Sequence, residues 1–304
     1  MGKLDFVKEI ICNKKYRTNF LIRKGFFEKI SDEQFLKKVF EVKLNKDLDL
    51  NNPKTFNEKL QWLKLNDRCP EYTIMVDKYL VRDYIARKLG EEYLIPLLGV
   101  WDSPEEIDFT MLPDQFVLKC NHNSGLGMCI CKDKSSLHIE SVKKELKKGL
   151  AQNYYLEGRE WPYKNVPRKI VCEKFMTDNS GELADYKIHN FNGEPKVILV
   201  CTNRFSKDGL REDFYSDKWE HLPVKRPGCP NAEASLEKPA ELDEMLRLSR
   251  ILAKDIPFLR TDFYVINGRI YFGELTFYPA SGFAAFEPES YDELFGGWIK
   301  LPVN

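Results

Sequence analysis

The chain has 304 residues, of which 43% are hydrophobic, 31% charged and 13% aromatic. This balance is typical of a folded globular protein and excludes a disordered or fibrous one. The length is enough for about two structural units. Lysine and arginine together number 47, as do aspartate and glutamate. Because these charges cancel, no overall field attracts DNA or RNA, and we do not expect nucleic acid as a partner.

The sequence contains no signal for export or membrane insertion. No apolar run approaches the length of about 20 residues that a membrane-spanning helix requires. Residues 1–20 carry charges where a secretory signal has its apolar stretch. We therefore expect a cytoplasmic protein whose eight cysteines are reduced thiols.

Residues 1–70 have the pattern of amphipathic helices. Ser31 followed by Gln34 has the form of a capping box and predicts a helix that starts near residue 31. Within 1–30, basic residues outnumber acidic ones eight to three. This segment is either an ordinary solvated helix face or a surface that contacts an anionic membrane or an acidic substrate. A solvated helix face is the more common of these two cases.

Two further helices are predicted before residue 91. One follows Asn52-Pro53 and carries Phe56, Leu60 and Leu63. The other is predicted as a single helix over 73–90, ending at Gly90.

From about residue 115 the pattern changes to short β-branched and aromatic runs, which are typical of strands. The predicted strands are 116–120, 128–132, 169–176, 185–191, 196–203, 261–266 and 269–277. Helices are predicted near 139–153 and 240–254, and 206–239 is expected to be one long connection. The second half is therefore predicted to be α+β, with mainly antiparallel strand pairing.

The strongest candidate site lies on a predicted hairpin with Asn-Gly at 267–268. Arg260 and Asp262 share one face of its first strand, and Glu274 and Thr276 share one face of its second. A two-residue loop would place the two pairs on opposite faces, whereas a three-residue loop with the glycine in a bulge would bring all four side chains together. Together they would suit Mg²⁺ and a phosphate or oxyanion, and an ordinary polar face is the alternative.

A second candidate site is the loop 121–127, which follows a predicted strand that ends near Lys119. Asn121, Ser124 and Gly125 suit a flexible loop whose backbone N–H groups fold over phosphates, with Lys119 as a nearby charge. An ordinary β-turn is the alternative. Asp185 and Lys187 alternate on another strand, where they form either part of a site or a plain ion pair.

Three other chemistries fit the sequence poorly. Cys120, His122, Cys129 and Cys131 are types of residue that bind zinc, but their spacing differs from the usual C-x₂-C and matches alternating burial on strands. No G-x-S-x-G nucleophile motif is present. The D-L-D at 47–49 lies in a helix-to-loop transition among lysines, which is a poor position for a metal in sugar-nucleotide transfer.

Taken in order, five blocks of sequence resemble the ATP-grasp superfamily and, within it, the TupA-like family found with bacterial surface-polysaccharide synthesis. They are NPKTFNEKLQWLK, VDKYLVRDYIARKLGEEYLIPLLGV, FVLKCNHNSG, DYKIHNFNGEPK and GELTFYPASGF, within about 52–300. The resemblance implies an ATP-grasp fold, in which two α+β lobes with antiparallel sheets clamp ATP, preceded by a helical region. The implied units are 1–70 (helical), 71–114 (a small α/β segment), 115–172 (small lobe with the phosphate lid loop) and 173–304 (large lobe with the metal site).

The resemblance also implies roles in nucleotide binding. Lys78 and Lys119 match the two lysines that contact the phosphates of ATP, and 121–127 matches the lid loop over them. The further implied contacts are the hinge residues Glu173, Lys174, Phe175 and Met176 and, near the triphosphate, Asp185 and Lys187.

The implied catalytic and metal residues lie mainly on the hairpin. Arg260 matches the arginine that stabilises the oxyanion, with Lys187 and Arg204 as the other expected catalytic residues. Asp262 and Glu274 match the carboxylates that bind one or two Mg²⁺ ions. Thr276 stands where the superfamily usually has asparagine, which leaves the number of ions open.

The implied reaction is an ATP-dependent ligation of a carboxylate to an amine through an acyl phosphate, with ADP and phosphate released. The implied acceptor is a hexuronic acid or another acidic glycan, and the implied donor is an amino acid or amine. A glycosyltransferase of the same pathway and a non-catalytic nucleotide-binding module are the alternatives. Binding of UDP-sugars without ATP would favour the first, and MgATP binding without turnover the second.

Overall fold

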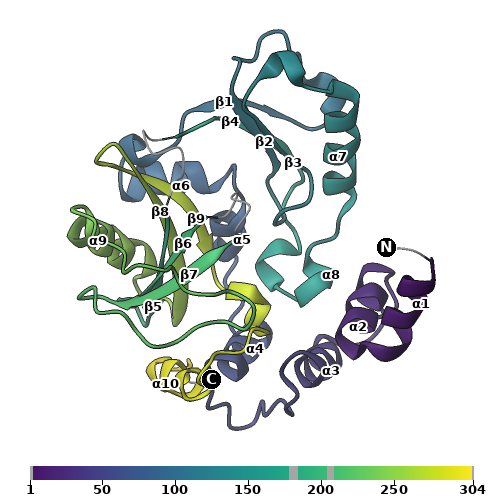
Figure 1. Cartoon of the computed structure of the whole chain (residues 1–304), viewed down its shortest axis with the longest axis vertical. Helices are drawn as coiled ribbons and strands as arrows, with labels where there is room; N and C mark the ends of the chain where they lie inside the picture. The colour runs from purple at the N-terminus through teal and green to yellow at the C-terminus, as the bar shows by residue number, and fades with distance from the viewer. Residues whose placement is uncertain (1–2, 178–183, 204–208, 303–304) are drawn as a thin grey trace.

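The computed structural model describes residues 3–177, 184–203 and 209–302. These residues form helices and two antiparallel sheets, one of four strands and one of five. The predicted α+β class is therefore confirmed. Figure 1 shows each sheet in its own lobe, with the N-terminal helices to one side of both. In this part of the chain, no helix is long and apolar enough to cross a membrane.

Three helices begin the chain: α1 (Lys3–Cys12), α2 (Lys14–Arg23) and α3 (Asp32–Leu44). Helix α3 starts where predicted, because Ser31 Oγ accepts a hydrogen bond from Gln34 N at 3.2 Å and the Gln34 side chain accepts one from Ser31 N at 3.3 Å. The apolar face of α3, with Leu48 from the segment after it, forms a small separate core, made of Phe35, Leu36, Val39, Phe40 and Leu48.

Helix α4 (Phe56–Asn66) belongs to a different core, that of the five-stranded sheet. The Phe56 ring lies 4.9 Å from the Phe258 ring and 6.3 Å from the Phe295 ring, measured between centroids. Because α4 supplies part of this core, the N-terminal region is joined to the large lobe through it.

The prediction of a single helix over 73–90 is wrong. The structure has α5 (Glu71–Val76) and α6 (Val81–Lys88), with an extended residue, Asp77, after the first. Asp77 Oδ1 accepts hydrogen bonds from the backbone N–H groups of Tyr79 (2.8 Å) and Leu80 (3.2 Å). An aspartate that satisfies free N–H groups in this way favours a new helix start over continuation of the old helix.

The four-stranded sheet forms the small lobe. Its strands are β1 (Leu97–Trp101), β2 (Phe116–Cys120), β3 (Met128–Cys131) and β4 (Ile170–Lys174), in the order β1-β4-β2-β3. Helix α7 (Ile139–Ala151) packs Leu146 against Phe116, Leu118 and Cys172 on one face of the sheet. Helix α8 (Tyr155–Gly158) follows it. The sequence did not predict β1.

The five-stranded sheet forms the large lobe. Its strands are β5 (Asp185–Phe191), β6 (Glu194–Thr202), β7 (Arg211–Ser216), β8 (Phe258–Ile266) and β9 (Arg269–Thr276), in the order β7-β6-β5-β8-β9. Helix α9 (Leu242–Ala253) contacts β8, β6 and β5, and α10 (Ser290–Trp298) contacts α4. Strand β7 lies within 206–239, so the prediction that this stretch is one long connection is wrong. Phe214 and Tyr215 are buried there at the edge of the sheet.

The sequence left both a two-residue and a three-residue loop open for the β8–β9 hairpin, and the structure has the two-residue loop. Ile266 pairs with Arg269, and the loop residues Asn267 and Gly268 have φ values of 51° and 75°. Positive φ at both positions is typical of the tight turn that Asn-Gly favours.

Candidate active site

A bulge in β9 brings the carboxylates of the hairpin to one face. Asp262 pairs with Glu274 while Phe263 pairs with Phe272, which leaves Gly273 without a partner residue in the register. This extra residue shifts β9 by one position relative to β8. The four side chains therefore share one face, as expected for a three-residue loop, although the loop has two residues and the partners differ: Arg260 pairs with Thr276 and Asp262 with Glu274.

Arg260 is fully engaged by the two carboxylates. Its Nε and Nη2 donate to Asp262 Oδ1 and Oδ2, both at 2.7 Å, and Nη2 also donates to Glu274 Oε1 at 2.7 Å. Although burial disfavours the charge of Arg260, the carboxylates of Asp262 and Glu274 raise the pKa of Arg260 above its usual value. The guanidinium is thus a fixed positive charge at the centre of the site.

Lys187 on the neighbouring strand extends this network. Its Nζ donates to Asp262 Oδ2 and lies 2.6 Å from Asp185 Oδ2. Burial works against its charge, but Asp262 and Asp185 raise the pKa of Lys187. The predicted residues Asp185, Lys187, Arg260, Asp262 and Glu274 therefore lie together on one face of β5, β8 and β9.

Thr276 completes the oxygen donors at the end of β9. Its Oγ1 lies 3.3 Å from Glu274 Oε1 and can donate to it. Two carboxylates and a hydroxyl are the hard oxygen ligands that Mg²⁺ prefers. Glu274 has the more accessible side chain, 42% exposed, whereas that of Asp262 is 1% exposed. Asp262 must therefore exchange part of its contact with Arg260 or Lys187 before it can bind a metal.

The two lysines predicted to contact phosphates, Lys78 and Lys119, come from outside the large sheet. Lys78 follows α5, and its Nζ donates to Asn123 O at 2.5 Å. Burial lowers the pKa of Lys78, and the next largest influences are the attraction of Glu274 and the repulsion of Lys119. The charges of Glu274 in the large lobe and of Lys119 in the small lobe therefore both act on Lys78.

Lys119 on β2 is held by an ion pair with Glu173 on β4. Its Nζ donates to Glu173 Oε2 at 2.5 Å, and Arg82 Nη1 lies 3.4 Å from Glu173 Oε1. The side chain of Glu173 therefore orients Lys119 and contacts α6, a role that the sequence did not predict.

The lid loop is anchored at its start and exposed at its tip. The buried Asn121 side chain donates to Asp77 Oδ1 (2.9 Å) and Pro167 O (2.7 Å) and accepts from Lys169 N (2.7 Å). Ser124 and Gly125 are exposed, and a Cβ added to Gly125 would meet nothing within 4 Å. Ser124 and Gly125 are therefore placed to contact a ligand, whereas the Asn121 side chain is occupied within the protein.

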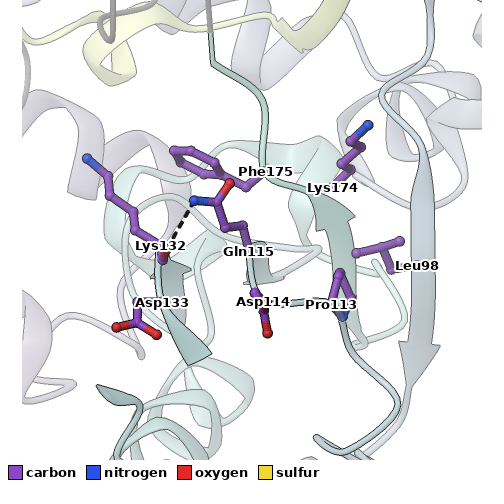
Figure 2. Close-up of a pocket in the computed structure, with 8 residues that line it drawn as sticks. All are labelled: Leu98, Pro113, Asp114, Gln115, Lys132, Asp133, Lys174 and Phe175. Carbon is purple, nitrogen blue, oxygen red and sulfur yellow. Dashed lines mark hydrogen bonds between the residues drawn. The ribbon is translucent and has the colours of Figure 1, made fainter. Parts of the chain in front are cut away.

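Two of the predicted hinge residues, Lys174 and Phe175, line a pocket of about 730 Å³ at one end of the small sheet. Figure 2 shows Phe175 and Lys174 at one side of it, with Gln115 donating to Lys132 O at 3.1 Å. Pockets of this size hold small organic ligands. Lys174 N donates to Pro96 O, so the backbone N–H of Lys174 is already occupied within the protein.

Sequence reasoning missed two buried charged residues, Lys64 and Glu160, that influence each other electrostatically. Lys64 on α4 is 0% exposed and Glu160 after α8 is 5% exposed. Burial raises the pKa of Glu160, and the charges of Lys64 and Arg260 oppose this rise. Lys64 lies on a predicted amphipathic helix, where nothing in the pattern distinguishes it from a solvated lysine. Arg204, the remaining predicted catalytic residue, lies outside the described residues.

Comparison with known proteins gave a family match and several structural matches. The family described as TupA-like ATPgrasp matches residues 58–300. A D-alanine–D-alanine ligase from Helicobacter pylori is 16% identical, with a TM-score of 0.42 over 82% of this chain and 70% of that one. Comparison with curated proteins gave no match.

Two other solved structures are similar over shorter parts. A D-alanine–D-alanine ligase from Bacillus anthracis, complexed with ATP, is 19% identical, with a TM-score of 0.41 over 67% of this chain and 55% of that one. A phosphoribosylamine–glycine ligase from Thermotoga maritima is 16% identical, with a TM-score of 0.36 over 68% of this chain and 48% of that one. The chain thus spans about half the length of these two ligases.

Proposed function

The chain belongs to the TupA-like ATP-grasp family, and on this premise we propose that it is an ATP-dependent carboxylate–amine ligase. The predicted family and fold are both confirmed, since the match covers residues 58–300 and both sheets lie within that range. The proposal goes further in naming the reaction as amide formation through an acyl phosphate, with release of ADP and phosphate.

One observation carries the proposal: cations from three separate elements surround a pair of metal-type carboxylates. Arg260 on β8 contacts Asp262 and Glu274, Lys187 on β5 contacts Asp262, and the charge of Glu274 acts on Lys78, which follows α5. Phosphoryl transfer needs fixed positive charge and a metal far more than it needs a protein nucleophile. Bound to Asp262 and Glu274, Mg²⁺ would neutralise charge on the transferring phosphate.

The residues divide the reaction between them. Lys78, Lys119 and the loop tip at 124–125 bind the phosphates, and the pocket beside Phe175 takes the base. The acceptor carboxylate then attacks the γ-phosphorus and ADP leaves. Arg260 stabilises the oxyanion that forms when the amine attacks the acyl phosphate, before the carbon–oxygen bond to phosphate breaks.

The acceptor is proposed to be a hexuronic acid of a bacterial surface polysaccharide or its precursor, and the donor an amino acid or amine. We also propose that the basic segment 1–30 contacts the inner face of the membrane or an acidic glycan. In that segment Ile11 is 65% exposed and Phe26 is 70% exposed, with exposed lysines nearby, a combination that suits an anionic interface.

Thermal unfolding with ATP, ADP, UDP-sugars and EDTA, with and without Mg²⁺, tests the nucleotide site. A ligand that binds only the folded protein raises the melting temperature. We expect a Mg²⁺-dependent rise with ATP and none with UDP-sugars. Phosphate release is then measured with uronic acids and amines together. A rise with UDP-sugars alone would favour a glycosyltransferase, and MgATP binding without any acceptor-dependent turnover a non-catalytic module.

A further inference from the structure

The active face of the large sheet continues beyond the residues assigned so far. In the strand register, Glu274, Asp262, Lys187, Leu199 and Phe214 form one row across all five strands. Directly paired residues point to the same side of a sheet. Phe214 on β7 therefore shares its face with the metal carboxylates.

Arg226 lies over the β7 end of this row. Its guanidinium carbon is 6.0 Å from the centre of the Phe214 ring. Burial, together with the positive charge of Arg260 and against the attraction of Glu212, lowers the pKa of Arg226. Because Phe214 and the carboxylates that hold Arg260 share one face, the two arginines lie on the same side of the sheet.

These arginines differ in what holds them. Arg260 makes three hydrogen bonds to carboxylates. Within residues 3–177, 184–203 and 209–302, the Arg226 side chain donates no hydrogen bond, and its ion pair with Glu212 is long, at 3.8 Å between Nη1 and Oε1. The Arg226 side chain is only 16% exposed, and both its Nε and Glu212 Oε2 are buried without a partner.

A buried guanidinium without hydrogen bonds is unfavourable unless a ligand supplies the missing acceptors. Its planar set of donors matches a carboxylate, which can accept two parallel hydrogen bonds. His189 pairs with Arg260 in the register, and burial and the charges of Arg260 and Arg226 lower its pKa well below the usual value. A neutral imidazole adds no positive charge to this face beyond that of Lys187, Arg226 and Arg260.

We propose that Arg226 recognises a carboxylate group of a co-substrate beside Arg260, with Glu212 holding the guanidinium in place. This inference rests on the proposed ligase function, and it assigns the recognition of an organic acid to a residue outside the metal and phosphate sites. The carboxylate comes either from a uronic acid acceptor or from an amino-acid donor. Both sources share the same chemistry, and the test separates them.

The test is isothermal titration of protein saturated with MgADP. A panel of hexuronates is compared with the matching neutral sugars, and a panel of α-amino acids with their amides. We expect at least one carboxylate to bind and its neutral counterpart not to. Arg226→Lys, which keeps the charge but loses the planar donors, should weaken this binding about tenfold, and Arg226→Met about a hundredfold. The panel that responds identifies the source.

Arg250→Met is the matched control, because Arg250 is an exposed arginine on α9 that pairs with Glu194 at the start of β6. It should leave carboxylate binding unchanged, and every variant should bind MgADP within about twofold of wild type. The ligand-free melting temperature of Arg226→Lys should stay within about 2 °C of wild type, since the guanidinium donates no hydrogen bond within the described protein.

Three results would overturn the inference. In the first, wild type, Arg226→Lys and Arg226→Met bind the carboxylate equally well. In the second, the neutral counterparts bind as tightly as the acids. In the third, wild type binds no carboxylate at 20 mM. Failure of the ligase proposal can be told apart from failure of this inference. If the ligase proposal fails, the protein does not bind MgADP when it is titrated with MgADP before the carboxylates. The carboxylate titrations are then run on ligand-free protein and judged in the same way.

Discussion

The two carboxylates that we propose as metal ligands differ in how much the fold depends on them. Asp262 is buried between Arg260 and Lys187, whereas the side chain of Glu274 is 42% exposed. Removing one partner of a buried ion pair costs about 3–5 kcal/mol, while an exposed pair contributes less than about 1 kcal/mol. The two carboxylates can therefore be separated by experiment, although both are expected to be needed for turnover.

We predict that Glu274→Gln lowers ADP formation at least about a hundredfold and changes the free energy of unfolding by less than about 1 kcal/mol. Asp262→Asn should lower activity as much and destabilise the protein by about 3 kcal/mol. Urea unfolding and an ADP-release assay measure the two effects. Equal destabilisation by both substitutions would contradict this assignment of burial.

Lys64 should make stability depend on pH. Burial lowers its pKa from 10.5 to about 7, against the attraction of Glu160 and Asp32. Its Nζ nevertheless donates to Gln61 Oε1 (2.9 Å), Gly158 O (2.7 Å) and Ser281 O (2.8 Å). Unfolding takes up a proton at Lys64 between pH 7 and 10.5, so the folded state gains relative stability as the pH rises through this window.

The expected gain of wild type over Lys64→Met is on the order of 4 kcal/mol between about pH 7 and pH 10. It is measured by urea unfolding of both proteins at each pH, so that groups common to both cancel. Lys37→Met on an exposed face of α3 is the control and should show no such trend. A difference between wild type and Lys64→Met that stays constant with pH would show that Lys64 is charged in the folded protein at all these values.

The break between α5 and α6 is an element on which the nucleotide site depends. Asp77 Oδ1 starts α6 and also accepts a hydrogen bond from Asn121 in the lid loop at 2.9 Å. Lys78 is the next residue, and its backbone N donates to Asn121 O at 3.2 Å. One carboxylate therefore fixes a helix start, a phosphate lysine and the base of the lid together.

Asp77→Ala is expected to lower the free energy of unfolding by about 1–2 kcal/mol, the usual cost of a lost helix cap. It should also weaken MgATP binding, because Lys78 and the lid lose their common anchor. Asp83→Ala, at an exposed position in the first turn of α6, is the control and should change neither quantity. Calorimetry and urea unfolding give both values. If Asp77→Ala destabilises the protein without affecting MgATP affinity, the anchor is purely structural.

The sequence predicted elements well where local chemistry determines them. The capping box of α3 and the Asn-Gly hairpin turn are examples, because each depends on residues within four positions of one another. Prediction from the sequence failed where contacts between residues far apart in the chain determine the structure. The bulge at Gly273 arises from pairing with β8, and β7 is a strand because β6 offers it an edge. Arg226 and Glu160 could not be found for the same reason, since long-range packing places both near Arg260.

At the scale of the whole molecule, the N-terminal 66 residues divide between two cores. Helix α3 packs within the small cluster around Phe35 and Phe40, whereas α4 supplies Phe56, Leu60 and Leu63 to the core of the large lobe. The two helices are adjacent in sequence, and the pattern of both is amphipathic. Only the folded arrangement distinguishes the helix that is part of the catalytic lobe from the one that lies beside it.

Two truncations test this division. Residues 53–304 retain α4 and should fold and bind MgATP, with a lower melting temperature because Arg68 and Tyr155 lose their contacts with Asp32. Residues 67–304 lack three large apolar side chains of the main core, each of which contributes about 2–5 kcal/mol, and should not fold cooperatively. Circular dichroism during heating, followed by MgATP titration, compares the two chains. Cooperative unfolding of 67–304 would contradict the view that α4 is part of the large lobe, because a core that lacks Phe56 would then be sufficient.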